Sequence, residues 1–128
     1  MNDSLRDIAA ELGRFASERD WAQFHSPKNL ASALVVEAGE LLEHFQWLTE
    51  AESRALSEEK RAEVGAEIAD VLLYLVQLAT ALGIDPIVAA TEKMKVNERK
   101  YPASLSRGSR LKSTALREAG AKPSSGER

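Results

Sequence analysis

Residues 57–83 read SEEKRAEVGAEIADVLLYLVQLATALG, and no other part of the chain constrains the architecture as strongly. Ser57, with Glu58 and Glu59 behind it, is typical of a helix N-terminus, through side-chain capping and the helix dipole. Gly83 is typical of a helix end. The apolar sequence between these signals predicts one long helix, and no strand pattern competes with it.

Three further helices follow from the same kinds of signal on either side. Ser4 begins a helix with an apolar repeat that ends near residues 19–21, and Ser26 followed by Pro27 begins one that runs to about Trp47. Asp85-Pro86 repeats the cap-then-proline pattern and begins a helix that ends before Pro102. The polar residues 49–56 are expected to be a connector. Short connections between helices predict an all-α, antiparallel four-helix bundle.

The second helix is expected to face the core with a stripe of four apolar residues, namely Leu34, Ala38, Leu41 and Phe45. Further apolar residues lie on other sides of the second and third helices. A bundle this small buries a modest core, so these extra faces predict a homo-oligomer.

The 128 residues suit one domain, which we place at residues 1–102. From Ala103 onward the sequence becomes rich in Ser, Gly, Lys and Arg. We therefore expect residues 103–128 to form a flexible tail.

Composition narrows the function classes. A formal net charge of −3 argues against a dedicated nucleic-acid binder, and the absence of cysteine excludes disulfides and thiolate chemistry. The N-terminus has no basic start followed by an apolar run, and no stretch of about 18 uncharged apolar residues occurs. We expect a cytoplasmic protein that does not act on a membrane.

Two pairs of acids lie inside apolar sequence. Glu37 and Glu40 belong to LVVEAGELL, and Glu67 and Asp70 belong to VGAEIADVLL. Each i, i+3 spacing puts both acids on one helix face, and two such helices side by side would bring four carboxylates together. Desolvated anions this close need a cation, and an all-oxygen site favours Mg²⁺, with Mn²⁺ as a substitute.

A single pair of this kind is most often a solvent-facing feature of an amphipathic helix. Two pairs, each flanked by apolar residues, favour the metal site. Glu63 is interpreted as a solvated first-turn acid rather than a ligand for a second metal. His44, one turn after Glu40, is interpreted as a structural or rim histidine.

The fourth predicted helix carries groups that suit phosphate. Lys93, Asn97, Lys100 and Tyr101 recur at helical spacing on one side. Cations and amide donors opposite a carboxylate cluster would suit a metal-bound triphosphate. A solvated basic helix end that favours the helix dipole explains the spacing equally well.

Aromatic residues flank the second helix and follow the acidic pair on the third. Trp21, with His25 close behind, precedes the second helix, and Trp47 ends it. Their rings could stack on a base, with core packing as the even alternative. Tyr74 and Gln77 continue the face of Glu67 and Asp70 as a polar stripe, where Tyr74 could bind substrate or a backbone group.

These motifs together resemble one family. The two acidic pairs resemble the signature of the all-α, MazG-like nucleoside triphosphate pyrophosphohydrolases. Four segments are similar to the dCTP pyrophosphatase branch: RDWxQFHxPxNL at 19–30, FQW at 45–47, DVLxYLV at 70–76 and KMxxNxxxYP at 93–102. The resemblance covers roughly residues 5 to 105.

The resemblance implies tetramers assembled as paired dimers and Mg²⁺-dependent removal of pyrophosphate from a deoxynucleoside triphosphate. We expect a role in nucleotide pool cleansing rather than in biosynthesis, because the sequence shows no channel, fusion domain or targeting segment. By position, Glu37, Glu40, Glu67 and Asp70 would bind metal and carry the catalysis. Other positions would contact the nucleotide: Lys93, Asn97 and Tyr101 the phosphates, Tyr74 the sugar, and Trp21 and Trp47 the base. From their places in the sequence we add Lys100 to the phosphate residues and His25 to the base and sugar residues. Leu12 stands where this branch carries a base-reading histidine, so the preferred base stays open.

Two alternatives remain at this stage. The chain could be a non-catalytic helical dimerisation or adaptor module whose acids bind a basic partner. It could also perform the same chemistry on dUTP or on another damaged nucleotide. The sugar and the number of metals per site also stay open.

Overall fold

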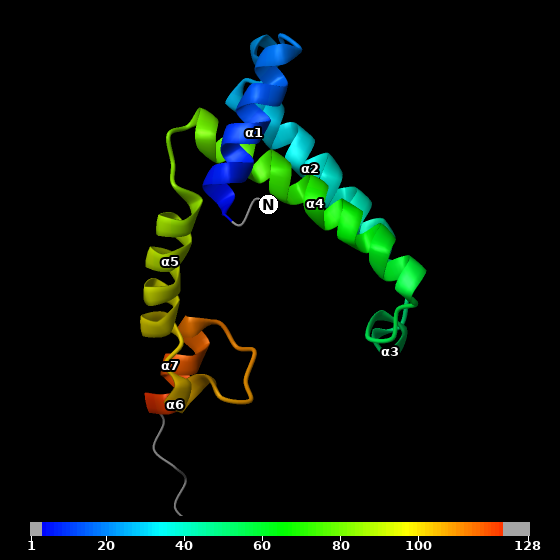
Figure 1. Ribbon diagram of the computed structural model, residues 1–128. Coiled ribbons are helices and arrows are strands. Elements are labelled where there is room, and N and C mark those ends of the chain that lie inside the picture. Colours follow the sequence, from blue (N-terminus) through cyan, green and yellow to red (C-terminus); the bar gives the residue numbers. More distant parts are fainter. Residues whose placement is uncertain (1–3, 122–128) are drawn as a thin grey trace, which may run out of the picture. The chain divides into compact units, whose positions relative to one another are not determined.

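The computed structural model describes residues 4–121, and this range contains helices and no strands (Figure 1). The all-α class expected from the sequence is therefore confirmed. In chain order the elements are α1 (Leu5–Glu18), the 3₁₀ turn η1 (Ala22–Phe24), α2 (Pro27–Glu43), α3 (Glu50–Ser53), α4 (Glu58–Ala81), α5 (Pro86–Lys100), α6 (Ala103–Ser106) and α7 (Ser113–Ala121).

Serine caps begin the three long helices of the first half. The side chain of Ser4 accepts a hydrogen bond from the backbone N–H of Asp7, and Ser26 caps α2 in the same way with Pro27 at the first helical position. Ser57 accepts from the N–H of Lys60 at the start of α4. Each cap satisfies a backbone donor and stabilises its helix by about 1 kcal/mol. The helix starts predicted from sequence are confirmed.

The helix ends are predicted less well. Gly83 follows α4 with φ +66°, the left-handed conformation that glycine adopts without strain, as expected. The predicted end of α2 is wrong, because the helix stops at Glu43 and residues 44–47 form turns. The connector expected at 49–56 contains α3, which begins with a reciprocal capping box between Thr49 and Glu52.

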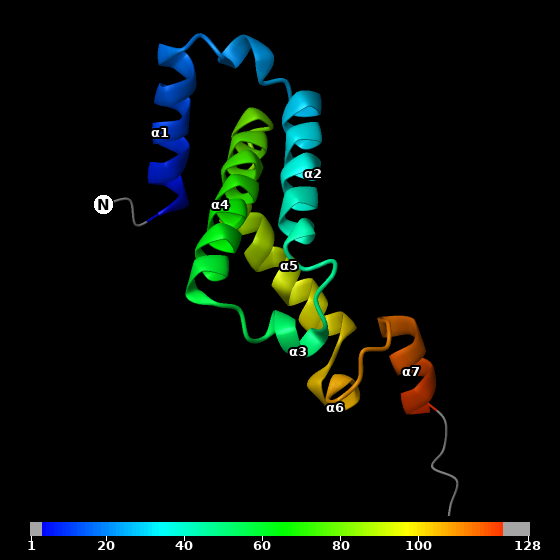
Figure 2. The ribbon, with the colours of Figure 1, turned by 90° about the vertical axis from the view of Figure 1, so that its right-hand side faces the viewer.

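Two compact units divide between Asp85 and Pro86. In the first unit α4 packs against both α1 and α2, and α2 runs antiparallel to α4 (Figure 2). The buried core is small; its best-buried member is Leu30, which is 2% exposed, and its other members are Ala16, Val64, Val76 and Ala79. The full four-helix bundle stays a prediction, since α5 belongs to the second unit.

Large apolar side chains stay exposed on the helices of the first unit. The examples on α2 and α4 are Val35, Val36, Leu42, Ile68 and Leu75. The stripe expected to fill the core is only partly correct: Leu34, Leu41 and Phe45 are half-buried, whereas Ala38 is exposed.

Within the described residues, α4 is the one helix long and apolar enough to cross a membrane on length and composition alone. Core helices of soluble proteins meet the same criteria. Helix α4 packs against two other helices and carries Glu67 and Asp70 in its apolar sequence. We therefore interpret α4 as the core helix of the first unit.

The second unit contains α5, α6 and α7. Leu116 of α7 is buried, and Gly120 approaches Leu105 of α6 so closely that a Cβ there would lie 2.8 Å from a leucine methyl. A flexible tail was expected from residue 103, with a domain boundary after residue 102; the structure instead has helices α6 and α7 up to residue 121, and its division lies at residue 85. Residues 122–128 lie outside the described range.

Candidate metal centre and adjoining pocket

Three carboxylates converge between α2 and α4. Glu37 of α2 and Glu67 and Asp70 of α4 each offer one oxygen, and these oxygens lie within 4.8 Å of one another. The i, i+3 spacing puts Glu67 and Asp70 on one face of α4, and the antiparallel packing of α2 brings Glu37 opposite them. The convergence expected from the two acidic pairs is thus present for three of the four residues.

Glu40, the fourth predicted residue, is exposed and joins the cluster through Glu37. A hydrogen bond with Glu40 is the largest cause that raises the pKa of Glu37; burial comes next, followed by the negative charges of Glu40, Asp70 and Glu67. A raised pKa means that Glu37 keeps its proton to a higher pH than an isolated glutamic acid does. Without a cation, the cluster lowers its own charge in this way.

The cluster has unused acceptors that suit a metal ion. The Oε2 atoms of Glu37 and Glu67 are buried and have no hydrogen-bond partner among residues 4–121. Buried carboxylate oxygens rarely remain without a partner, and a cation would satisfy both. All donors are carboxylate oxygens, the ligands of hard divalent ions. The acidic cluster can therefore hold a metal.

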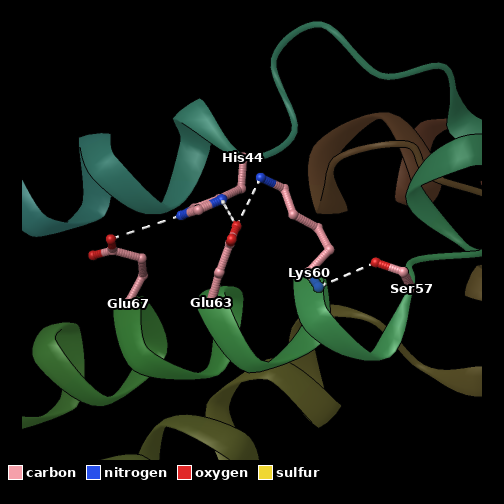
Figure 3. Close-up of polar contacts among 5 residues, drawn as sticks. All are labelled: His44, Ser57, Lys60, Glu63 and Glu67. Carbon is pink, nitrogen blue, oxygen red and sulfur yellow. Dashed lines mark hydrogen bonds and ion pairs between the residues drawn. The ribbon is translucent and has the colours of Figure 1, made fainter.

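His44 lies beside Glu67, one of the three carboxylates of the cluster, and beside Glu63, as Figure 3 shows. Its Nε2 lies 3.7 Å from an oxygen of Glu67, and its Nδ1 lies 3.8 Å from an oxygen of Glu63. Glu63 is also 3.0 Å from the ammonium of Lys60. The His44 side chain is only 17% exposed and lies outside the compact group of Glu37, Glu67 and Asp70. This position matches a rim histidine, and its partner Glu63 is half-exposed.

A pocket of about 570 Å³ adjoins the cluster at Asp70. One wall comes from α1 and the turn after it, with Leu12, Phe15, Trp21 and His25, and the other from α4. Trp21 packs edge-on against Phe15, with ring centroids 5.6 Å apart. The residues of α4 that line the pocket are Asp70, Leu73, Tyr74 and Gln77. A pocket that combines apolar and polar side chains beside a candidate metal centre is typical of a small-molecule site.

Comparison with known proteins identifies the family. Residues 33–116 match the MazG-like family.

The chain belongs to the MazG-like family.

The sequence is 48% identical to dCTP pyrophosphatase 1 of Homo sapiens over 115 residues, which cover 88% of this chain and 68% of the human protein. It is 47% identical to dCTP pyrophosphatase 1 of Mus musculus over the same shares. The crystal structure of a pyrophosphatase from Archaeoglobus fulgidus superposes with a TM-score of 0.74 at 42% identity, covering 80% of this chain and 95% of that one. This MazG-like protein is a nucleotide pyrophosphohydrolase, and the resemblance found in its sequence is confirmed.

Only some of the residues predicted to contact the base and the sugar lie together in the pocket of this MazG-like chain. Trp21, His25 and Tyr74 line the pocket, as does Leu12. Trp47 does not line it, and its side chain is 88% exposed. Because α2 ends at Glu43, Trp47 lies in the turns beyond the helix rather than on its face.

The predicted phosphate residues belong to the second unit. Lys93, Asn97 and Lys100 are exposed on α5, and Tyr101 follows its last residue. Within that unit they keep the helical spacing that suggested a common side. Their assignment to phosphate stays a prediction.

Most of the pocket wall that α1 contributes was not predicted from the sequence. Phe15 lines the pocket, and Arg19 lies 3.6 Å above its ring, yet neither was expected to contribute to the site. No local signal marks them, because the face of α1 that meets α4 depends on tertiary packing. Leu73 and Gln77 had a signal: they follow Asp70 at i+3 and i+7, on its helix face.

Proposed function

We propose that the protein is a Mg²⁺-dependent pyrophosphohydrolase that converts dCTP, or a modified dCTP, to the monophosphate and pyrophosphate and so cleanses the nucleotide pool. The observation that carries this proposal is the position of Asp70, which belongs both to the carboxylate cluster and to the pocket wall. A nucleotide with its base in the pocket has its phosphates at the cluster. dCTP is the substrate named for the curated relatives.

Glu37, Glu67 and Asp70 would hold Mg²⁺, for which Mn²⁺ would substitute, with Glu40 beside them. A bound divalent ion supplies charge neutralisation at the phosphates and a lowered pKa for water. Glu40 is exposed and lies outside the group of three carboxylates that approach within 4.8 Å. It is therefore the carboxylate best placed to accept the proton of the attacking water.

The pocket residues would position the substrate. Trp21, fixed against Phe15, offers an aromatic surface to the base, and His25 lines the same wall. Tyr74 lies one turn beyond Asp70, where its hydroxyl suits the sugar. Lys93, Asn97, Lys100 and Tyr101 would bind the phosphates, on the strength of the family resemblance and their common spacing. Trp47 is assigned to the base by resemblance alone.

We propose that the enzyme is a cytoplasmic homo-oligomer, with a tetramer formed from two dimers. The exposed Val35 and Val36 on α2 and Ile68 and Leu75 on α4 support an oligomer, because a monomer would leave these side chains in water. The small core of the first unit supports it further.

Pyrophosphate release from a panel of canonical and modified deoxynucleoside triphosphates, with Mg²⁺ and with chelator, tests the proposal. We expect chelator-sensitive release that is fastest with a cytosine base. Faster release from dUTP or a damaged nucleotide would keep the chemistry and change the substrate. No release in Mg²⁺ or Mn²⁺ would refute the enzyme and favour the adaptor module.

A further inference from the structure

One face of α4 runs from the metal centre into the pocket. Asp70, Leu73, Tyr74 and Gln77 are spaced at i, i+3, i+4 and i+7, and all four line the same cavity. At 1.5 Å per residue, Gln77 lies roughly 10 Å along the helix axis from Asp70. A nucleotide with its α-phosphate at Asp70 would therefore place its base near Gln77.

The surroundings of Gln77 are apolar. A second cavity of about 200 Å³ also borders this residue, and both cavities share Leu12, Ala16 and His25 as lining. Apart from Asp70, the charged residues of the larger pocket are exposed and lie on α1 or directly after it, where Arg14 pairs with Glu11 and Arg19 pairs with Glu18. Gln77 lines both cavities and is a neutral side chain that carries hydrogen-bond donors as well as an acceptor.

The carboxamide of Gln77 is free to bind a ligand. It is half-buried, and it makes no hydrogen bond with another residue in the described range 4–121. A glutamine side chain carries two N–H donors and one carbonyl acceptor. A ligand that displaces water from the pocket must replace the hydrogen bonds of these groups, and a polar ligand edge does so.

We propose that Gln77 reads the pyrimidine ring of the substrate and accepts both cytosine and uracil. This proposal rests on the proposed function. Cytosine presents an amino donor beside the N3 acceptor, and uracil presents a keto acceptor beside the N3–H donor. A carboxamide pairs with either edge by turning over, because its oxygen and nitrogen exchange places. Since no described residue fixes its orientation, the site tolerates exchange of an amino group for a keto group.

Side chains that cannot turn over in this way test the proposal. Gln77→Glu offers acceptors only and should favour dCTP, whereas Gln77→Lys offers donors only and should favour dUTP. For the wild type we expect kcat/KM values for dCTP and dUTP within about tenfold of each other. Each variant should shift that ratio by about tenfold or more, in opposite directions, as for loss of a paired base contact.

General damage to folding or to the metal site lowers kcat/KM for both substrates alike, so it leaves the ratio of the two kcat/KM values unchanged. Gln46→Glu and Gln46→Lys are matched controls, because Gln46 is exposed and does not line either cavity; they should leave the ratio unchanged. Gln77→Met retains length without hydrogen bonds, so it should lower kcat/KM for both substrates in parallel, mainly through KM.

Some results would overturn the role of Gln77 and leave the enzyme intact. These are a wild-type preference above about a hundredfold for one base, or the same shift in both charged variants. If no triphosphate is cleaved, the proposed function fails instead. Binding of dCMP and dUMP, followed by tryptophan fluorescence, then still tests Gln77: similar affinities that both weaken in Gln77→Met support it, and unchanged affinities reject it.

Discussion

Glu67→Gln should make the metal-free protein more stable and the metal-bound protein less stable. The substitution keeps the shape of the side chain and removes one of the three charges that lie within 4.8 Å of one another. Two unit charges at that distance repel by about 1 kcal/mol in water-like surroundings and about 3 kcal/mol nearer the protein interior. We use the lower value for the Glu67–Asp70 pair, because Asp70 is exposed.

One contact opposes this gain. His44 lies 3.7 Å from Glu67, and an ion pair at such a distance contributes between 0 and about 1 kcal/mol. Glu67 is repelled by both Glu37 and Asp70, at about 1 kcal/mol each, so the repulsion outweighs this contact. A net gain of about 1 kcal/mol raises the Tm of a chain of this size by roughly 3 °C.

Thermal unfolding in chelator and in Mg²⁺ measures both effects. At a hundredfold excess over Kd, Mg²⁺ should stabilise the wild type by about 2.7 kcal/mol, and the variant by much less. The order of the two Tm values should therefore reverse between chelator and Mg²⁺. A variant that is less stable in chelator, or equally stabilised by Mg²⁺, would refute the reasoning.

Three further predictions concern neighbouring side chains. Glu40→Gln should abolish turnover while Mg²⁺ still raises the Tm; activity close to wild type would remove Glu40 from the mechanism. The raised pKa of Glu37 means that its contribution to metal-free stability is fully present below its ordinary value of 4.5 and is lost as pH rises through the raised value. The metal-free wild type should thus lose more Tm than Glu37→Gln between pH 4.5 and pH 7, and parallel curves would contradict this. Trp21→Ala should raise KM about tenfold or more by removing a stacking surface, with kcat less affected; an unchanged KM would show that the base binds elsewhere.

The helix starts were predictable because their signals are local. Ser4, Ser26 and Ser57 each cap a backbone donor three residues away, so a few adjacent residues determine the outcome. The end of α2 was not predictable, because the apolar pattern continues to Trp47 while the helix stops at Glu43. Helix α3 has one turn and no apolar repeat, so only its capping residues marked it.

Long-range contacts explain most of the remaining differences. The composition after residue 102 suggested a flexible tail, but Leu116 is buried there and Gly120 packs against Leu105. The residues that make these contacts are far apart in the sequence, so no local pattern predicts that they pack together. The same limit applies to the pocket: helical spacing predicted that Glu67 and Asp70 share a face, whereas the approach of Phe15 to α4 depends on how two helices pack.

Helix α4 continues without a break from the carboxylate cluster to Gln77 in the lining of the pocket. Because the rise per residue of an α-helix is fixed, α4 fixes the distance between the residues at the cluster and those deeper in the pocket. The distance from the base to the site of cleavage is then set by the backbone and not by a mobile loop. A nucleotide held by its base can present only the phosphorus at that distance, so the helix selects the bond that breaks as well as the molecule that binds.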